Sequence, residues 1–376
     1  GESRITTHPH FFRLRALLCN LTYSLTLTFI PPHHYHMEGY HFVNKTRNPY
    51  FDTLKAIAIL CVVYAHCLQY LGIESYLHHP LFRTIYAFHM PLFMAVSGYF
   101  SVHAMQLSLN ELAKKKSIRL LLPCLTAGIV VISFNNVIGL TDRYNDWKEL
   151  VGNLWYLKSL FVCMLMAKLA LTLTKNNMKA AAIISLLLAL PFYLWHVNFM
   201  MPFFWLGILW YYYSDFIQRK ALIICAVALV FFILLWPLWD GYHTTYITPL
   251  RFFSLSPFQW TGLQHADSYL FRVAMGTAGS IVIAAGISCL YKRGRRFQWL
   301  EALGQHTLEI YTIHFFFIHT ALLQLCAITY VVGWYELVYC LFITGVMILL
   351  CELIRRLFSH SSLLNFLFFG VYNRQM

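Results

Sequence analysis

Apolar stretches long enough to cross a membrane, separated by short polar breaks, recur along most of this chain. Of its 376 residues, 59% are hydrophobic and 11% are charged, and the mean hydropathy is +0.59. A helix needs about 20 predominantly apolar residues to cross a bilayer, and this composition is typical of membrane proteins. The sequence therefore predicts an all-α, polytopic integral membrane protein and argues against a soluble globule with one large core.

About ten transmembrane helices are predicted from the apolar runs that follow residue 48. Their approximate ranges are 52–72, 82–104, 118–139, 151–173, 179–195, 198–214, 220–239, 268–291, 306–329 and 334–356. The fifth and sixth are short and contain Pro191 and Pro202, so their boundaries are the hardest to place. The longest connection, around 240–267, is rich in aromatic residues and histidine and is a candidate to contact a substrate.

The charges of the connections give an independent test of this topology, because cytoplasmic loops carry an excess of lysine and arginine. Every second connection is basic: Lys45 with Arg47, Lys114–Lys116 with Arg119, Lys175 with Lys179, Arg219 with Lys220, Lys292–Arg296, and Arg355 with Arg356. This alternation predicts that the N and C termini are both cytoplasmic. It also explains the formal net charge of +13 better than nucleic-acid binding does, because the basic residues form no single stripe.

Residues 1–47 are predicted to be an N-terminal extension that is disordered or a non-native leader, with Met37 as the natural start. The stretch before Met37 is apolar with polar interruptions and lacks the small-residue cleavage site of a signal peptide. An interfacial or additional spanning helix over roughly 14–31 is the alternative. Residues 48–358 are predicted to form the membrane domain, and residues 359–376 a short cytoplasmic tail.

Lys55 and His66 stand on the first predicted helix and are the strongest candidates for chemistry. Eleven steps along a helix make almost three turns, so the two side chains share a face about 16 Å apart along the axis. Ionisable groups inside a bilayer are costly and usually functional. His89, on the second predicted helix, can share a layer with His66 if the two helices are neighbours. Ser97 follows it, in a stretch whose proline and glycine favour close packing or a cavity.

Further polar residues mark the ends of other predicted helices. Lys116 and Arg119 would offer positive charge to an anionic cofactor, although such lysines are first of all topology determinants. Trp155 follows Asn153 at the start of the fourth helix, where an aromatic residue is also typical of the membrane interface. Glu309 and His314 lie in the ninth helix. The ten cysteines include no CxxC pair and are interpreted as buried hydrophobes, so no metal is expected.

Several of these segments together resemble the acyltransferase 3 family of membrane proteins, and within it the fucose 4-O-acetylase-like branch. The likeness covers about residues 48–356. It is carried by FDTLKAIAILCVVYAH with Asp52, Lys55 and His66, by Phe88–Phe100, by Arg119 to Pro123, by LWYL at 154–157 and by LGQHTLEIYTIH at 303–314. The family has an arginine where Lys55 stands, and lysine keeps the charge but loses the planar, two-pronged grip on phosphate.

The resemblance implies a membrane acyltransferase domain over 48–358 in the inner (plasma) membrane. It would move an acyl group, acetyl in most members, from cytoplasmic acyl-coenzyme A to a hydroxyl of a cell-surface sugar, polysaccharide or glycolipid, without a metal. His66 would be the general base, and His89 and Ser97 would belong to the catalytic set. Ser97, Tyr311 or Asn153 could donate a hydrogen bond to the developing oxyanion. Direct transfer is favoured over an acyl-enzyme intermediate at Ser97, because no G-x-S-x-G elbow is present. Lys55, Arg119, Lys116 and Asp52 would serve the coenzyme A, and Asn153, Trp155, His314 and Glu309 the acceptor.

Two other functions fit the residues alone. A transporter or flippase would use the intramembrane histidines as a proton relay and would need no coenzyme A. A membrane scaffold would use them for packing, so that loss of His66 would lower stability and abolish no reaction.

Overall fold

The computed structural model describes residues 47–71, 76–138, 150–244, 247–255, 258–322 and 335–371. The expected extension over 1–47 lies, apart from Arg47, outside the described residues, as does the end of the ninth predicted helix beyond residue 322. Everything that follows concerns the unit that begins at Asn48.

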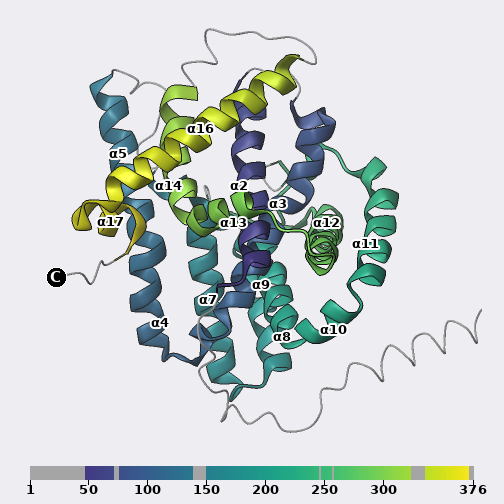
Figure 1. The fold of residues 1–376 in the computed structure, drawn as a ribbon. Helices are drawn as coiled ribbons and strands as arrows, with labels where there is room; N and C mark the ends of the chain where they lie inside the picture. The colour runs from purple at the N-terminus through teal and green to yellow at the C-terminus, as the bar shows by residue number, and fades with distance from the viewer. Residues whose placement is uncertain are drawn as a thin grey trace, which may run out of the picture. The chain divides into compact units, whose positions relative to one another are not determined.

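Helices make up nearly all of the described chain (Figure 1). The α-helices are α2 (Pro49–Tyr70), α3 (Pro80–Ser101), α4 (Leu109–Lys116), α5 (Leu122–Val137), α7 (Trp155–Leu173), α8 (Met178–Ala189), α9 (Val197–Tyr212), α10 (Ser214–Arg219), α11 (Ala221–Leu235), α12 (Ala266–Lys292), α13 (Gln298–Leu303), α14 (Thr307–Phe317), α16 (Tyr335–Ser359) and α17 (Ser362–Phe369). Two π-helical segments, η3 (Ser117–Leu121) and η9 (Ile318–Leu322), continue α4 and α14. Short 3-10 turns are η1 (Tyr76–His78), η2 (Ala104–Gln106), η5 (Leu194–His196), η6 (Trp236–Leu238), η7 (Gly241–His243) and η8 (Gly304–His306).

Six stretches of the described chain are long and apolar enough to cross a membrane. They are Pro49–Tyr70, Leu109–Val137, Trp155–Leu173, Ala221–Leu238, Ala266–Lys292 and Leu337–Ser359. This confirms a helical, multi-pass membrane protein. The number of ten spans and the cytoplasmic termini stay predictions.

The connection around 240–267 is less irregular than the sequence suggests. It contains η7 and an antiparallel hairpin of β1 (Arg251–Leu255) and β2 (Phe258–Gln264), paired from Arg251 with Gln264 to Leu255 with Phe258. The predicted all-α class is therefore interrupted by one two-stranded ribbon.

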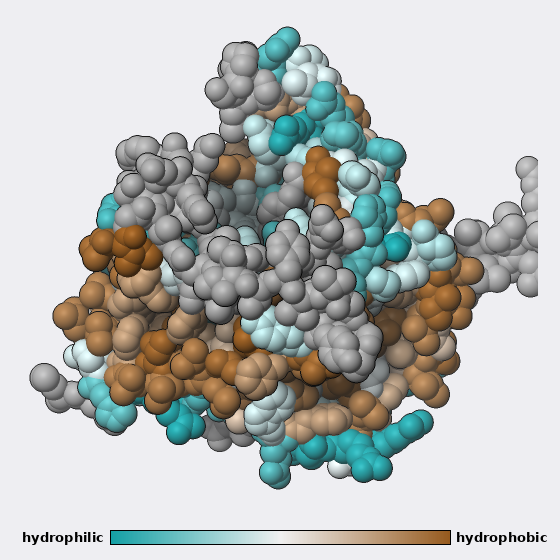
Figure 2. All heavy atoms as spheres, turned by 90° about the horizontal axis from the view of Figure 1, so that it is seen from above, coloured by the Kyte–Doolittle hydropathy of each residue, from teal (hydrophilic) through white to brown (hydrophobic). Residues whose placement is uncertain are grey.

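Apolar side chains cover much of the outer surface of the helices. Figure 2 shows brown, apolar residues over a broad part of one face, with hydrophilic residues towards its margins. Helix α11 contributes many exposed apolar side chains, among them Leu222, Val227 and Leu234. Such a surface suits hydrocarbon and not water.

Helices α3 and α9 approach each other closely at two glycines. A Cβ atom on Gly98 would lie 2.1 Å from the carbonyl oxygen of Phe204, and one on Gly207 would lie 1.9 Å from that of Ala95. Because the two contacts run in opposite directions along the chain, the helices are antiparallel, with backbone against backbone. Small residues allow this approach, and it fixes the part of α3 that carries His89.

The basic residues after the second predicted helix lie on a helix and not in a loop. Helix α4 begins at Leu109 after a capping box, in which the Ser108 hydroxyl accepts from the Glu111 amide and the Glu111 carboxylate accepts from the Ser108 amide. The helix then widens into η3 directly before Pro123. Proline has no amide hydrogen to donate to the residue four positions earlier, here Arg119, so the regular ladder is interrupted there.

Candidate active site

Helix α2 carries both Lys55 and His66 without a break, as the spacing predicts. Its start is fixed by the Asn48 side chain, which accepts a hydrogen bond from the Tyr50 amide at 3.1 Å, and by Pro49 in the first turn. The helix is largely buried and lies centrally among its neighbours in Figure 1. Gly304 in η8 packs against the backbone of Asp52, which holds the Lys55 end of α2 in place.

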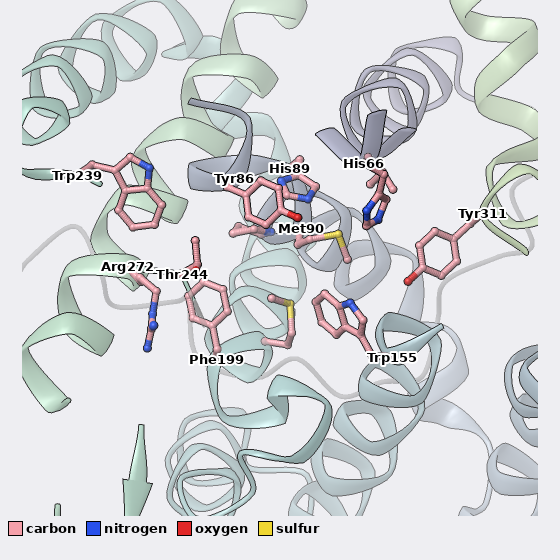
Figure 3. A pocket seen from close by; sticks show the side chains of 13 residues that line it. His66, Tyr86, His89, Met90, Trp155, Phe199, Trp239, Thr244, Arg272 and Tyr311 are labelled. Carbon is pink, nitrogen blue, oxygen red and sulfur yellow. The ribbon is translucent and has the colours of Figure 1, made fainter. Parts of the chain in front are cut away.

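A small internal cavity lies where α2, α3, α7, α9, α12 and α14 meet (Figure 3). Its volume is about 40 Å³, enough for a few water molecules. The residues that line it are Val62, His66, Tyr86, His89, Met90, Pro91, Trp155, Phe199, Met200, Trp239, Thr244, Arg272 and Tyr311. Of the residues expected from sequence, His66, His89 and Trp155 therefore meet at one cavity.

His66 stands in the cavity wall with an available ring nitrogen. Its Nδ1 atom is buried and has no hydrogen-bond partner among the described residues, and the ring also interacts with the side chain of Gln69. The ring centroid of His314 lies 5.7 Å away and that of Tyr70 lies 6.0 Å away. In the tautomer with the hydrogen on Nε2, this unpartnered Nδ1 holds a lone pair that can accept a proton from a bound group, which is what a general base requires.

His89 and His314 are both held by their own helices. His89 Nδ1 lies 2.7 Å from the carbonyl oxygen of Ile85, and His314 Nδ1 lies 3.1 Å from that of Ile310. A carbonyl only accepts hydrogen bonds, so in the neutral ring Nδ1 carries the hydrogen and Nε2 keeps its lone pair. His89 presents this fixed ring to the cavity, whereas His314 lies beside His66 and is not itself a cavity-lining residue.

Ser97 and Asn153 lie outside the cavity lining. The Ser97 hydroxyl is 2.8 Å from that of Tyr156, whose ring centroid is 6.0 Å from that of the cavity residue Tyr311. Asn153 donates from Nδ2 to the carbonyl of Cys124 at 2.9 Å, and its own carbonyl accepts from buried Lys158 at 2.7 Å. Asn153 thus fixes the turn that directs Trp155 into the cavity.

Four of the remaining charged candidates form two ion pairs. Lys55 Nζ lies 2.7 Å from Asp52 Oδ1, and Arg119 Nη2 lies 3.6 Å from Glu309 Oε1. Arg119 also donates to the backbone carbonyl of Phe369 at the end of α17. Glu309, expected at the acceptor, is therefore a partner of an arginine expected at the cofactor. Lys116 lies on α4, directly before η3.

Sequence reasoning missed the cavity residue Arg272. The signal was present, because this arginine lies inside the apolar run of α12, where an ionisable residue is unusual. Trp239 and Thr244 were missed for a different reason, since they come from the connection after α11 and nothing local links them to the histidines.

Comparison with known proteins agrees with the helical membrane architecture. The family described as "Acyltransferase domain" matches residues 48–371. The nodulation protein NolL of Mesorhizobium japonicum is 29% identical over 194 residues, which cover 45% of this chain and 52% of that protein. NolL of Sinorhizobium fredii is 33% identical over 193 residues, which cover 47% and 51% respectively. The matched region is about half of these relatives, and no solved structure matches. With nearly all of its described length inside the family match, the chain belongs to the acyltransferase 3 family.

Proposed function

We propose that this protein is a membrane O-acetyltransferase that moves an acetyl group from acyl-coenzyme A to a hydroxyl of a cell-surface sugar or glycolipid. The observation that carries the proposal is the unpartnered Nδ1 of His66 in a cavity wall, on the helix whose other end holds Lys55. Family membership supports the reaction class, and the cell-surface acceptor is part of the proposal. The finer placement in the fucose 4-O-acetylase-like branch, and in the inner membrane, is part of the proposal.

The reaction needs one proton acceptor and one polarised thioester. His66 takes the proton of the acceptor hydroxyl while its oxygen bonds to the acyl carbon. The carbon–sulfur bond then breaks, and the proton passes to the coenzyme A sulfur as it leaves. The Tyr311 hydroxyl is directed towards the middle of the cavity in Figure 3, beside Trp155, and is placed to donate to the oxygen that gains negative charge.

Positive charge at the Lys55 end suits the donor. Lys55, Arg119 and Lys116 would contact the phosphates of coenzyme A, while Asp52 and Glu309 hold Lys55 and Arg119 in position. Donor and acceptor would thus reach the same imidazole from the two ends of α2.

The test uses the purified full chain in lipid nanodiscs with radiolabelled acetyl-coenzyme A. The wild-type protein should release coenzyme A, and His66→Ala should lower the rate roughly a hundredfold to ten-thousandfold without loss of folding. His103→Ala is the matched control, because that histidine is exposed beyond the end of α3 and away from the cavity. Wild-type turnover by His66→Ala would remove the base assignment, and transport without any coenzyme A release would favour the transporter instead.

A further inference from the structure

Arg272 is a buried cation in the cavity wall that the proposed reaction leaves without a role. The residue is 2% exposed, and it lines the same cavity as His66 and His89. Among the described residues, no carboxylate lies within 4.0 Å of its guanidinium. Asp267, five residues earlier on α12, acts on the guanidinium electrostatically from beyond that distance, and the carboxylate of Asp240 is paired with His243 at 2.7 Å.

One edge of the guanidinium is anchored, and the Nε atom of the other edge is buried without a partner among the described residues. Nη1 donates to the carbonyl of His243 at 3.3 Å and to the hydroxyl of Thr248 at 3.2 Å, and the group lies 5.5 Å from the centre of the Phe199 ring. The hydroxyl of Thr244, another cavity residue, is likewise buried and unpartnered in the part of the chain that the structure describes.

This arrangement has the chemistry of an oxyanion site. A buried charge without a counter-ion is unfavourable unless something compensates it. The guanidinium edge offers parallel N–H groups whose spacing matches the two oxygens of a carboxylate or phosphate. Lys55 differs, because a carboxylate of the protein, that of Asp52, lies 2.7 Å from its ammonium group.

We infer that Arg272 and Thr244 form an acceptor subsite for an oxyanion, either the carboxylate of an acidic sugar or a phosphate attached to the sugar. The inference deepens the proposed function and rests on it. Figure 3 shows His66 and Arg272 on opposite sides of the cavity; the Arg272 side chain extends away from the two histidines, and the Phe199 ring lies beside its guanidinium. An acceptor that reaches Arg272 would pass this ring. An acceptor anchored at Arg272 by its anionic group can therefore present a hydroxyl to His66.

Binding to the full chain in nanodiscs tests the subsite without requiring turnover. The probes are methyl glucuronide, glucose 6-phosphate and methyl glucoside, which share a sugar ring and differ in charge. The wild-type protein should bind at least one anionic probe roughly ten to a hundred times more tightly than methyl glucoside, the gain expected from charged hydrogen bonds. Preference for the glucuronide assigns an acidic sugar, and preference for glucose 6-phosphate assigns a phosphorylated one.

Two substitutions separate the effect of the paired N–H groups of the guanidinium from the effect of its positive charge. Arg272→Gln should abolish the preference for an anionic probe over methyl glucoside. Arg272→Lys keeps the charge but loses the paired N–H groups, so it should keep only part of this preference. Arg251→Gln is the control, because Arg251 is an exposed arginine on β1 outside the cavity lining, and it should behave like wild type. If Arg272→Gln does not fold, Arg272→Lys and Thr244→Val carry the test, and both should weaken the preference.

The inference would be overturned if the wild-type protein bound all three probes equally. It would also be overturned if folded Arg272→Gln still preferred an anionic probe over methyl glucoside as strongly as the wild-type protein does. Binding of desulfo-coenzyme A by the wild-type protein reports the donor site separately. If that binding fails while the anion preference holds, the proposed function is wrong and the anion subsite remains.

Discussion

Replacing Gly207 by alanine should push apart helices α3 and α9, which both line the cavity beside His66. The new Cβ would lie 1.9 Å from the carbonyl oxygen of Ala95, whereas such contacts are essentially never closer than 3.0 Å, so α3 and α9 must separate locally by about 1.1 Å. Overpacking of this kind costs about 1–3 kcal/mol. Because α3 carries His89 and Met90, a shift of about 1 Å should also lower the rate of coenzyme A release roughly a hundredfold.

Gly286→Ala provides the matched control, since it adds the same methyl group to α12 at a position with nothing within 4 Å. There alanine should be neutral or should stabilise by up to about 1 kcal/mol, because glycine weakens a helix interior. The assays are unfolding in mixed detergent micelles and coenzyme A release. A Gly207→Ala protein with the stability and rate of the Gly286→Ala control would refute the close-packing argument.

Three other perturbations follow from local contacts. Ser108→Ala removes the capping box of α4 and should lower the free energy of unfolding by about 1 kcal/mol in the micelle assay; an unchanged value would mean that the cap contributes nothing. Hydrogen bonds from the Arg296 guanidinium, which is 2.7 Å away, hold the pKa of the Glu301 carboxyl at about 2 instead of 4.5. The ionised carboxylate therefore stabilises the folded protein fully above pH 4.5, and this contribution is lost as the pH falls towards 2. Glu301→Gln should reduce the fall in unfolding temperature between pH 4.5 and pH 2. The same fall in the variant as in the wild-type protein would contradict the role of the Glu301–Arg296 pair. Gly370→Val should detach α17 from η3, because Gly370 has φ of +62° and a Cβ there would lie 2.3 Å from the Ile118 carbonyl oxygen. Arg119, which donates to the end of α17, would then be displaced, and the KM for acetyl-coenzyme A should rise. An unchanged KM would contradict this prediction.

The sequence was most informative where one helix contains the whole pattern. The Lys55–His66 spacing predicts a shared face, and α2 is continuous from Pro49 to Tyr70. Pro91 and Gly98 predict a cavity or close packing in α3, and the structure has Pro91 in the cavity and Gly98 against α9. These features depend on local geometry, which sequence spacing determines.

Features that depend on tertiary structure could not be predicted in the same way. The pairing of Glu309 with Arg119 depends on how α14 packs near η3, and the hairpin from Arg251 depends on pairing between strands. Loop charges also misplaced the start of the helix at Leu109, because a capping box extends α4 through residues that positive charge alone assigns to a loop. Arg272 differs from these, since its position inside an apolar run could have identified it from sequence.

The cavity beside His66 has about 40 Å³ of space, whereas sites for small ligands usually measure roughly 300–1,000 Å³. The proposed sugar and thioester substrates would each have to displace side chains in order to enter a cavity of this size. Between turnovers only a few solvent molecules can stand next to the imidazole. The activated acyl group would then encounter an alcohol before bulk water, and the narrowness of the chamber would limit wasteful hydrolysis.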